Sequence, residues 1–208
     1  MINFNAGPTV KDFLDSRKFI KVIEGPVGGG KSTAALFDLF SRAVLQTPFK
    51  GVRRTRFIIL RNTMQQLKST VKPLLDAWFI TMPPTPLGEW RLTENVFEMR
   101  FALPDGTSVH SEFWMMPADT PDDVRRLLSL ECSAAWAEEC REVDPEVFDS
   151  LSGRVARFPS RAAGGVAYPG VIGSTNPPPL GTYWQEHISN PPENWGVFVQ
   201  PITHGWLS

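Results

Sequence analysis

A glycine-rich stretch near the N-terminus constrains the fold of this chain more than any other feature. It reads Gly25-Pro26-Val27-Gly28-Gly29-Gly30-Lys31-Ser32 and matches the pattern G-x-x-x-x-G-K-[ST]. The glycines allow backbone N–H groups to approach an anion without a Cβ in the way, and the helix that follows directs its positive end at the same place. The pattern therefore predicts a strand, a phosphate-binding loop and a helix, in that order.

The same loop predicts a ligand, a nucleoside triphosphate with Mg²⁺. Lys31 can reach the β and γ phosphates, which makes it a catalytic candidate, and the Ser32 hydroxyl can ligate the metal ion. GTP-specific proteins normally read their base with an Asn-Lys-x-Asp motif, but Asn176 is followed by three prolines and the motif is absent elsewhere. ATP is therefore favoured. The expected nucleotide-binding residues are Gly25, Gly28, Gly29, Gly30, Lys31, Ser32 and Thr33.

The order of apolar segments predicts an α/β fold with a mostly parallel central sheet flanked by helices. Buried strands are expected at residues 19–24 and 57–60, each followed by an amphipathic helix, at residues 32–45 and 64–79. This alternation is typical of parallel strands joined by right-handed crossovers. Strand-like runs on both sides of Pro104-Asp105-Gly106 predict a β-hairpin, inserted or at the sheet edge.

The second half of the chain predicts shorter elements. Thr120 and Asp144 have the character of helix N-caps, since each is followed by proline and then by acidic residues. A further short helix is expected at residues 183–188. Proline and glycine concentrate in the last third, which predicts many loops there.

Two adjacent acids offer the carboxylates that a nucleotide hydrolase needs. An apolar run from Cys132 to Ala137 ends in Glu138 and Glu139. At the carboxyl end of a buried strand, Glu138 would hold the metal ion and Glu139 would be the base that orients the attacking water. The alternative is that Ala-Ala-Trp-Ala-Glu-Glu is helical, with both acids facing water.

A second polar segment follows another buried run. Residues 171–174 read as a short strand, and Ser174, Thr175 and Asn176 end it. Polar side chains there would sense the γ phosphate and relay its presence. The alternative is an ordinary hydroxyl-rich turn stopped by proline.

Composition narrows the class of protein. The 208 residues suit a single domain, and Lys plus Arg (21) nearly balances Asp plus Glu (22), which argues against a uniformly basic nucleic-acid coat. A local basic segment at residues 50–61 reads either as a solvated loop entering a strand or as a DNA contact.

The two cysteines suit a reducing compartment, and neither a signal peptide nor a membrane span is expected.

Taken in order, four segments resemble a known family: the loop GPVGGGKS, then ILRNTMQQLKST, AWAEE and GSTNPP. Together they resemble the N-terminal ATPase domain of the large terminase subunit, the DNA-packaging motor of tailed double-stranded DNA bacteriophages. The resemblance implies a P-loop fold of the additional-strand, RecA-like type. It also implies that Glu138 is the Walker B acid, that Glu139 is the catalytic glutamate, and that residues 174–176 couple hydrolysis to movement.

The resemblance also implies partners and a location. The domain would drive double-stranded DNA into a procapsid as a homo-oligomeric ring on the viral portal, together with a small terminase subunit, in the host cytoplasm and without a membrane. The family's second, nuclease domain has no counterpart in the sequence, so we expect residues 1–208 to be one ATPase domain that does not cut DNA. Residues 5–16 lie where an adenine-contacting element is expected.

This chain departs from the family at two places, in the length of one acidic side chain and in the loop. The family usually has Asp then Glu where this chain has Glu138 then Glu139, and its loop often carries an arginine that is absent here. A charge-stabilising arginine must then come from elsewhere, for example from a neighbouring subunit. Arg126, just before the acidic strand, is the first candidate for this catalytic role, with Arg125, Arg154 and Arg157 as rivals.

Several other functions share the loop. A small-molecule kinase would need an acceptor pocket and an arginine-rich lid, a helicase-like ATPase would unwind or prefer single strands, and a nucleotide switch would lack the catalytic acids. Fold alone does not choose among these, but the Glu138-Glu139 pair and residues 174–176 favour hydrolysis.

Overall fold

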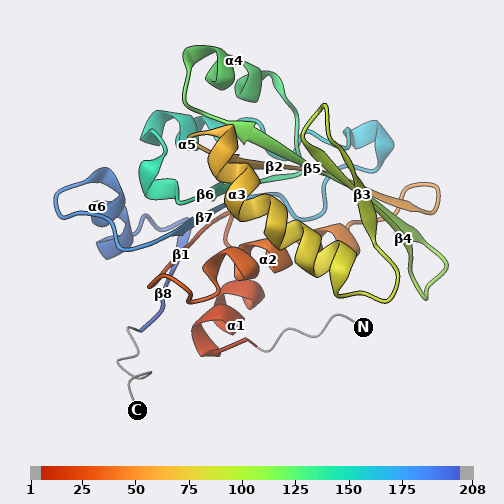
Figure 1. Ribbon diagram of the computed structural model, residues 1–208, viewed down its shortest axis with the longest axis horizontal. Helices are drawn as coiled ribbons and strands as arrows, with labels where there is room; N and C mark the ends of the chain where they lie inside the picture. The colour runs from red at the N-terminus through yellow and green to blue at the C-terminus, as the bar shows by residue number, and fades with distance from the viewer. Residues whose placement is uncertain (1–5, 202–208) are drawn as a thin grey trace.

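A single eight-stranded sheet runs through the computed structural model, which describes residues 6–201 (Figure 1). The strand order is β3-β4-β5-β2-β6-β7-β1-β8, and neighbouring strands from β5 to β8 in this order are parallel. The strands are β1 (Ile20–Glu24), β2 (Val52–Arg61), β3 (Gly88–Arg91), β4 (Val96–Ala102), β5 (Ser108–Pro117), β6 (Ala134–Glu138), β7 (Gly170–Thr175) and β8 (Trp195–Val199).

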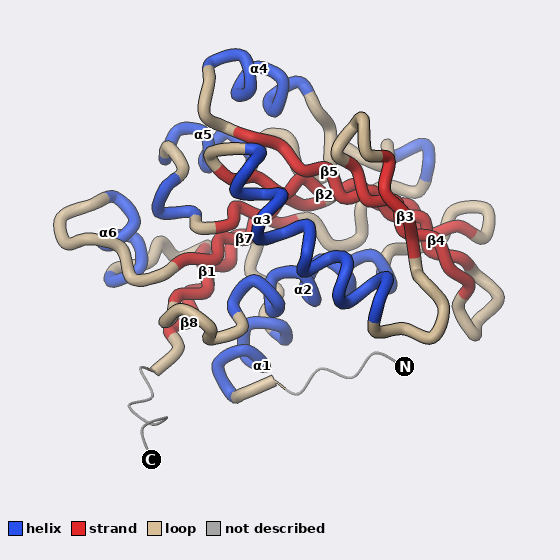
Figure 2. The backbone as a smooth tube through the Cα atoms, in the orientation of Figure 1, coloured by secondary structure: helices blue, strands red, loops and turns tan. Residues whose placement is uncertain are grey.

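Helices cover both faces of this sheet, as Figure 2 shows. The helices are α1 (Pro8–Asp15), α2 (Lys31–Leu45), α3 (Met64–Leu75), α4 (Pro121–Ser129), α5 (Pro145–Leu151) and α6 (Tyr183–Ser189). Buried side chains of α1, α2 and α3 belong to one hydrophobic cluster, and those of α4, α5 and α6 belong to a second. Strand β2 supplies both clusters in alternation, Phe57 and Ile59 to the first and Ile58 and Leu60 to the second. A strand buried on both faces has to be apolar throughout, which explains this run.

The topology confirms the predicted fold class. Strand β1, which leads into the phosphate-binding loop, does not pair with β6, the strand that ends in Glu138. Strand β7 lies between them and pairs in parallel with both. This inserted strand is the additional strand of the predicted P-loop type. Because these strands are parallel, the carboxyl ends of β1, β7 and β6 lie at one edge of the sheet.

The predicted hairpin is present and is part of the central sheet. Strands β4 and β5 pair antiparallel around the turn at Asp105-Gly106, and β5 also pairs in parallel with β2 from Val52↔Ser108 to Arg61↔Pro117. The short strand β3 adds a third antiparallel member at the edge. The hairpin therefore extends the sheet beyond β2.

Two expectations for individual elements are corrected. The helix expected to reach residue 79 is α-helical only to Leu75, after which Asp76–Thr81 form a π-helical turn. The reading of residues 50–61 as a solvated loop is wrong from Val52 onward, because this segment is strand β2. Its arginines meet acidic partners: Arg53–Asp105 at 2.7 Å, Arg56–Glu112 at 2.8 Å and Arg61–Glu142 at 3.6 Å. Intramolecular pairing thus accounts for much of the basic segment that was considered for DNA contact.

No helix within residues 6–201 is long and apolar enough to cross a membrane. Asn5, the first residue of the expected adenine-contacting segment, and the ends of the expected 1–208 domain lie outside the described residues.

Candidate nucleotide-binding site

The predicted phosphate-binding loop joins β1 to α2, and its backbone adopts conformations that require glycine. Gly28 (φ 79°) and Gly30 (φ 76°) lie in the left-handed region, where side chains are disfavoured. The N–H of Gly25 donates to Thr175 O (3.2 Å), and the N–H of Gly29 donates to Pro26 O (3.2 Å). The loop is thus anchored to β7 at its start and closed on itself, and the N-terminus of the 15-residue helix α2 follows directly.

Lys31 lies where the predicted acids meet the loop. Its ammonium donates to Pro26 O (2.7 Å) and to Asn176 Oδ1 (3.0 Å). Burial lowers the pKa of Lys31, while the nearby carboxylates of Glu139 and Glu138 raise it. The structure therefore brings Lys31 together with the acidic pair and with the polar end of β7, three segments that are distant in sequence.

Glu138 ends β6 and is buried between two hydroxyl groups. Ser32 Oγ donates to its Oε1 at 2.8 Å, and Ser174 Oγ donates to its Oε2 at 2.7 Å. Trp136 Nε1 donates in turn to Ser174 Oγ (2.9 Å), which orients that hydroxyl. Burial raises the pKa of Glu138, and the two hydroxyl hydrogen bonds lower it. The strand assignment rules out the helical reading of this segment.

The Ser32 and Glu138 pair fits a magnesium ion. A hydroxyl oxygen and a carboxylate oxygen lie side by side, and oxygen donors are what Mg²⁺ prefers. Within residues 6–201, no group of three or more His, Cys, Asp or Glu side chains is gathered as a metal site. One or two protein oxygens together with substrate phosphates are the usual Mg²⁺ ligands in such sites.

Glu139 lies at a sharp turn of the backbone. Its φ and ψ of 49° and 53° are left-handed, which is strained for a residue other than glycine and recurs at functional sites. Its Oε1 accepts a hydrogen bond from Asn176 Nδ2 (2.9 Å), and its Oε2 accepts one from Asn176 N (3.2 Å). Asn176 therefore contacts both Lys31 and Glu139. Thr175, also predicted here, is buried and donates from Oγ1 to Asn176 O (2.8 Å).

Sequence reasoning missed two residues at this site. Arg141, in the 3₁₀ turn Cys140–Glu142, has its Nε 3.6 Å from Glu139 Oε2, and its Nη1 donates to Pro177 O (2.9 Å). Gln200, directly after β8, donates from Nε2 to Gly29 O (2.7 Å). Neither residue belongs to a motif, so only the fold reveals them. Thr33 lies in the first turn of α2.

The four arginines considered for charge stabilisation lie apart from the acidic pair. Arg125 and Arg126 are exposed on α4, and Arg125 is hydrogen-bonded to Asp122. Arg154 is half-buried after α5, and Arg157 is exposed. Within residues 6–201, none of the four makes a hydrogen bond or ion pair with Glu138 or Glu139. Any role for them at this site requires movement or a second copy of the chain.

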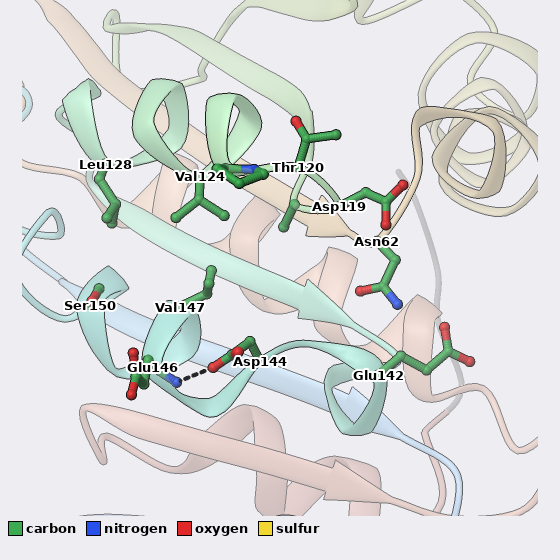
Figure 3. Close-up of a pocket in the computed structure, with 12 residues that line it drawn as sticks. Asn62, Asp119, Thr120, Val124, Leu128, Glu142, Asp144, Glu146, Val147 and Ser150 are labelled. Carbon is green, nitrogen blue, oxygen red and sulfur yellow. Dashed lines mark hydrogen bonds between the residues drawn. The ribbon is translucent and has the colours of Figure 1, made fainter.

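Two cavities lie near this edge of the sheet. One of about 470 Å³ is formed by residues 6–10, which belong to the segment expected to contact adenine, by loop residues including Gly28–Gly30, and by Gln200. The other, of about 570 Å³, lies between α4 and α5 (Figure 3). Its lining includes Asp119, Glu142, Asp144 and Glu146 and none of the predicted nucleotide-binding residues. The first cavity is therefore the candidate for a nucleoside.

No family model matches this chain, and no curated protein matches it. Solved structures of similar fold are found despite identities of 16% or less.

Large terminases are among these structures. The large terminase of a thermophilic bacteriophage has a TM-score of 0.69 and 10% identity, with 92% of this chain and 45% of that chain covered. The same terminase in complex with ADP has a TM-score of 0.66, 11% identity, and coverage of 92% and 44%. The large terminase ATPase domain of Thermus phage P74-26 has a TM-score of 0.54 and 16% identity, with 95% and 82% covered. The chain thus has the fold of these ATPase domains and spans less than half the length of the first of these terminases.

Proposed function

We propose that this chain is an Mg²⁺-dependent ATPase domain, the motor that drives double-stranded DNA into a viral procapsid. One observation carries the proposal: the Lys31 ammonium and the Glu139 carboxylate share a single partner, Asn176, beside the Ser32–Glu138 pair. A phosphate-binding loop alone binds nucleotide. A loop that is joined to a carboxylate base through a polar strand end is arranged to hydrolyse the nucleotide and to couple hydrolysis to movement. The fold shared with large terminases, one of them solved with ADP, supports the same function.

The residues take distinct roles in this proposal. Loop N–H groups and Lys31 bind the phosphates, while Ser32 and Glu138 hold Mg²⁺, which neutralises phosphate charge when bound. Glu139 orients the attacking water. Asn176 couples the phosphate-binding loop to the catalytic base, because its side chain contacts both Lys31 and Glu139. A phosphate that draws Lys31 toward itself removes the Lys31 contact from Asn176. The hydrogen bonds that hold Glu139 then change. Ser174 fixes the orientation of Glu138.

The proposal extends to partners that the fold does not identify. We propose that double-stranded DNA is the track, that a homo-oligomeric ring forms on the portal, and that a small terminase subunit assists in the host cytoplasm. Residues 1–208 are proposed to act as one ATPase domain, and cleavage of DNA is not among the activities that we propose.

Steady-state hydrolysis of Mg²⁺-ATP by the wild-type chain and by Glu139→Gln tests the enzyme assignment. The amide keeps the size of the side chain but is not a base, so the variant should bind ATP and fail to turn it over. Binding is measured separately, with a fluorescent ATP analogue. Equal turnover by both proteins would refute Glu139 as the base, and transfer to an added acceptor in place of water would indicate a kinase.

A further inference from the structure

A glutamine from the far end of the chain contacts the phosphate-binding loop. Strand β8 pairs in parallel with β1, so that Val199 lies opposite Glu24, and Gln200 follows directly. The backbone N–H of Gln200 donates to Glu24 O (2.8 Å), and its side-chain Nε2 donates to Gly29 O (2.7 Å). The loop is thus tied to a residue 171 positions later in the sequence.

This contact leaves little room for a side chain at position 29. Gly28 and Gly30 have left-handed φ angles, but Gly29 does not, and it occupies a variable position of the loop pattern. A Cβ at Gly29 would lie 2.5 Å from Gln200 Oε1, and a Cβ at Gly25 would lie 2.8 Å from Gln200 Cβ. The Gln200 side chain therefore occupies the space beside both glycines.

The bond from Gln200 also sets the direction of a loop N–H group. In a planar trans peptide, the C=O of one residue and the N–H of the next point in opposite directions. Because Gln200 holds Gly29 O, the N–H of Gly30 points away from Gln200. Gln200 Oε1 is buried and has no hydrogen-bond partner among residues 6–201, so burying the amide there costs free energy.

We propose that Gln200 is a positioning residue of the phosphate-binding loop, holding the Gly29–Gly30 peptide so that the Gly30 N–H faces the phosphates. The proposal rests on the proposed function, since it requires that the loop bind a nucleotide. Gln200 also lines the cavity of about 470 Å³ beside residues 6–10, so a role at the base is the competing explanation.

Pyrophosphate separates these two roles because it lacks a base. Titration calorimetry would measure the affinities of wild type and of Gln200→Leu for Mg²⁺-ATP and for Mg²⁺-pyrophosphate. Leucine keeps similar bulk but donates no hydrogen bond, so both affinities should fall about tenfold. The melting temperature without ligand should change little. A loss for ATP but not for pyrophosphate would overturn the proposal in favour of base contact.

A double-mutant cycle tests the pairing of Gln200 with Gly29. Gly29→Ala alone should weaken Mg²⁺-ATP binding, because its methyl group displaces the Gln200 amide. In the Gln200→Ala background the same change should cost much less, because the nearest atom is then Pro26 O at 3.1 Å. Gly28→Ala is the matched control: nothing lies within 4 Å of its Cβ, and its φ of 79° makes it costly in either background.

The outcomes separate this proposal from the proposed function. Additive effects of Gly29→Ala and Gln200→Ala, in a wild-type chain that binds ATP, would overturn the positioning role alone. Failure of the wild-type chain to bind either ATP or pyrophosphate would overturn both proposals.

Discussion

Lys21, Asp38 and Arg42 form an ion cluster in the interior of the protein. Asp38 Oδ1 lies 2.5 Å from Lys21 Nζ, Asp38 Oδ2 lies 2.7 Å from Arg42 Nε, and the Lys21 side chain is fully buried. Lys21 also donates to Phe13 O (2.9 Å) and contacts the Phe13 ring. Burial lowers the pKa of Lys21, and the Asp38 carboxylate opposes this shift. One carboxylate thus compensates two buried cations and connects α1, β1 and α2.

Replacing Asp38 by alanine should therefore destabilise the fold strongly. Lys21 and Arg42 would remain buried without a counter-charge, and removal of one partner of a buried pair costs about 3–5 kcal/mol of unfolding free energy. Urea denaturation measures the loss. Asp122→Ala is the matched control, because the Asp122–Arg125 pair is exposed and such pairs contribute about 0–1 kcal/mol. Equal losses in the two variants would contradict the prediction.

Residues of the site differ in how far the sequence determines their role. The chemistry of phosphate and metal binding requires Lys31, Ser32 and Glu138 in a recognisable order, so their pattern predicts where they meet. Arg141 and Gln200 serve the same site through one or two hydrogen bonds each, and many residue types at many positions make such bonds. No spacing specifies them, and only the folded chain brings them to the site.

At the scale of elements, aromatic packing connects the π-helical turn to the hairpin. Phe79 is fully buried, and its ring centroid lies 5.4 Å from Phe40, 6.0 Å from Phe97 and 6.0 Å from Phe113. These partners lie on α2, β4 and β5. The wider π-helical turn, which follows Pro73 closely, places Phe79 among them.

Phe79→Ala should consequently lower the unfolding free energy by about 3–5 kcal/mol, the cost of removing a buried phenyl group and leaving a cavity. Thermal and urea unfolding test this value. The ATP affinity of the folded protein should change little, because β4 lies toward the opposite edge of the sheet from β1 and its loop. Leu92→Ala, at an exposed position (68%) between β3 and β4, should change stability by less than about 0.5 kcal/mol. A small effect of Phe79→Ala would mean that the core closes around the missing ring.

Elements with a strong apolar periodicity or a helix cap are predictable from the sequence, and elements without either signal are not. The N-caps at Thr120 and Asp144 place the starts of α4 and α5 correctly, whereas the apolar run at residues 57–60 marks only the second half of β2, which begins at Val52. Strand β3 has only four residues, and β8 reads Trp-Gly-Val-Phe-Val without a polar residue to mark an alternation, so neither has a clear pattern. The end of α3 differs from the prediction because helical periodicity does not distinguish α from π hydrogen bonding.

At the scale of the whole molecule, strand order determines what one chain can supply to its own site. The parallel strands β1, β7 and β6 bring the loop, Asn176 and the acidic pair to one edge, with Arg141 beside Glu139. Arg126 is exposed on α4, which packs against β5 on the other side of β2. If Arg126 stabilises charge on the phosphates without a movement of α4, the site that it serves is in a neighbouring copy, and hydrolysis then depends on assembly.

Mixing two variants that should each be impaired tests this dependence. Arg126→Ala keeps Glu139 but lacks the arginine, whereas Glu139→Gln keeps the arginine but lacks the base. Each alone should hydrolyse ATP poorly under conditions where the wild-type chain self-associates. Their mixture should recover part of the activity, because some interfaces then pair an intact Glu139 with an intact Arg126 from the neighbour.

Arg125→Ala is the matched control for this experiment, since Arg125 is the adjacent exposed arginine on α4 and is held by Asp122 within its own chain. It should retain wild-type activity and need no complementation. Full assembly-dependent hydrolysis by Arg126→Ala would exclude Arg126 and direct the same test to Arg154 and Arg157. Loss of activity without recovery in the mixture would instead place the arginine at the site of its own chain, because only a residue donated across an interface is restored by a partner that carries it.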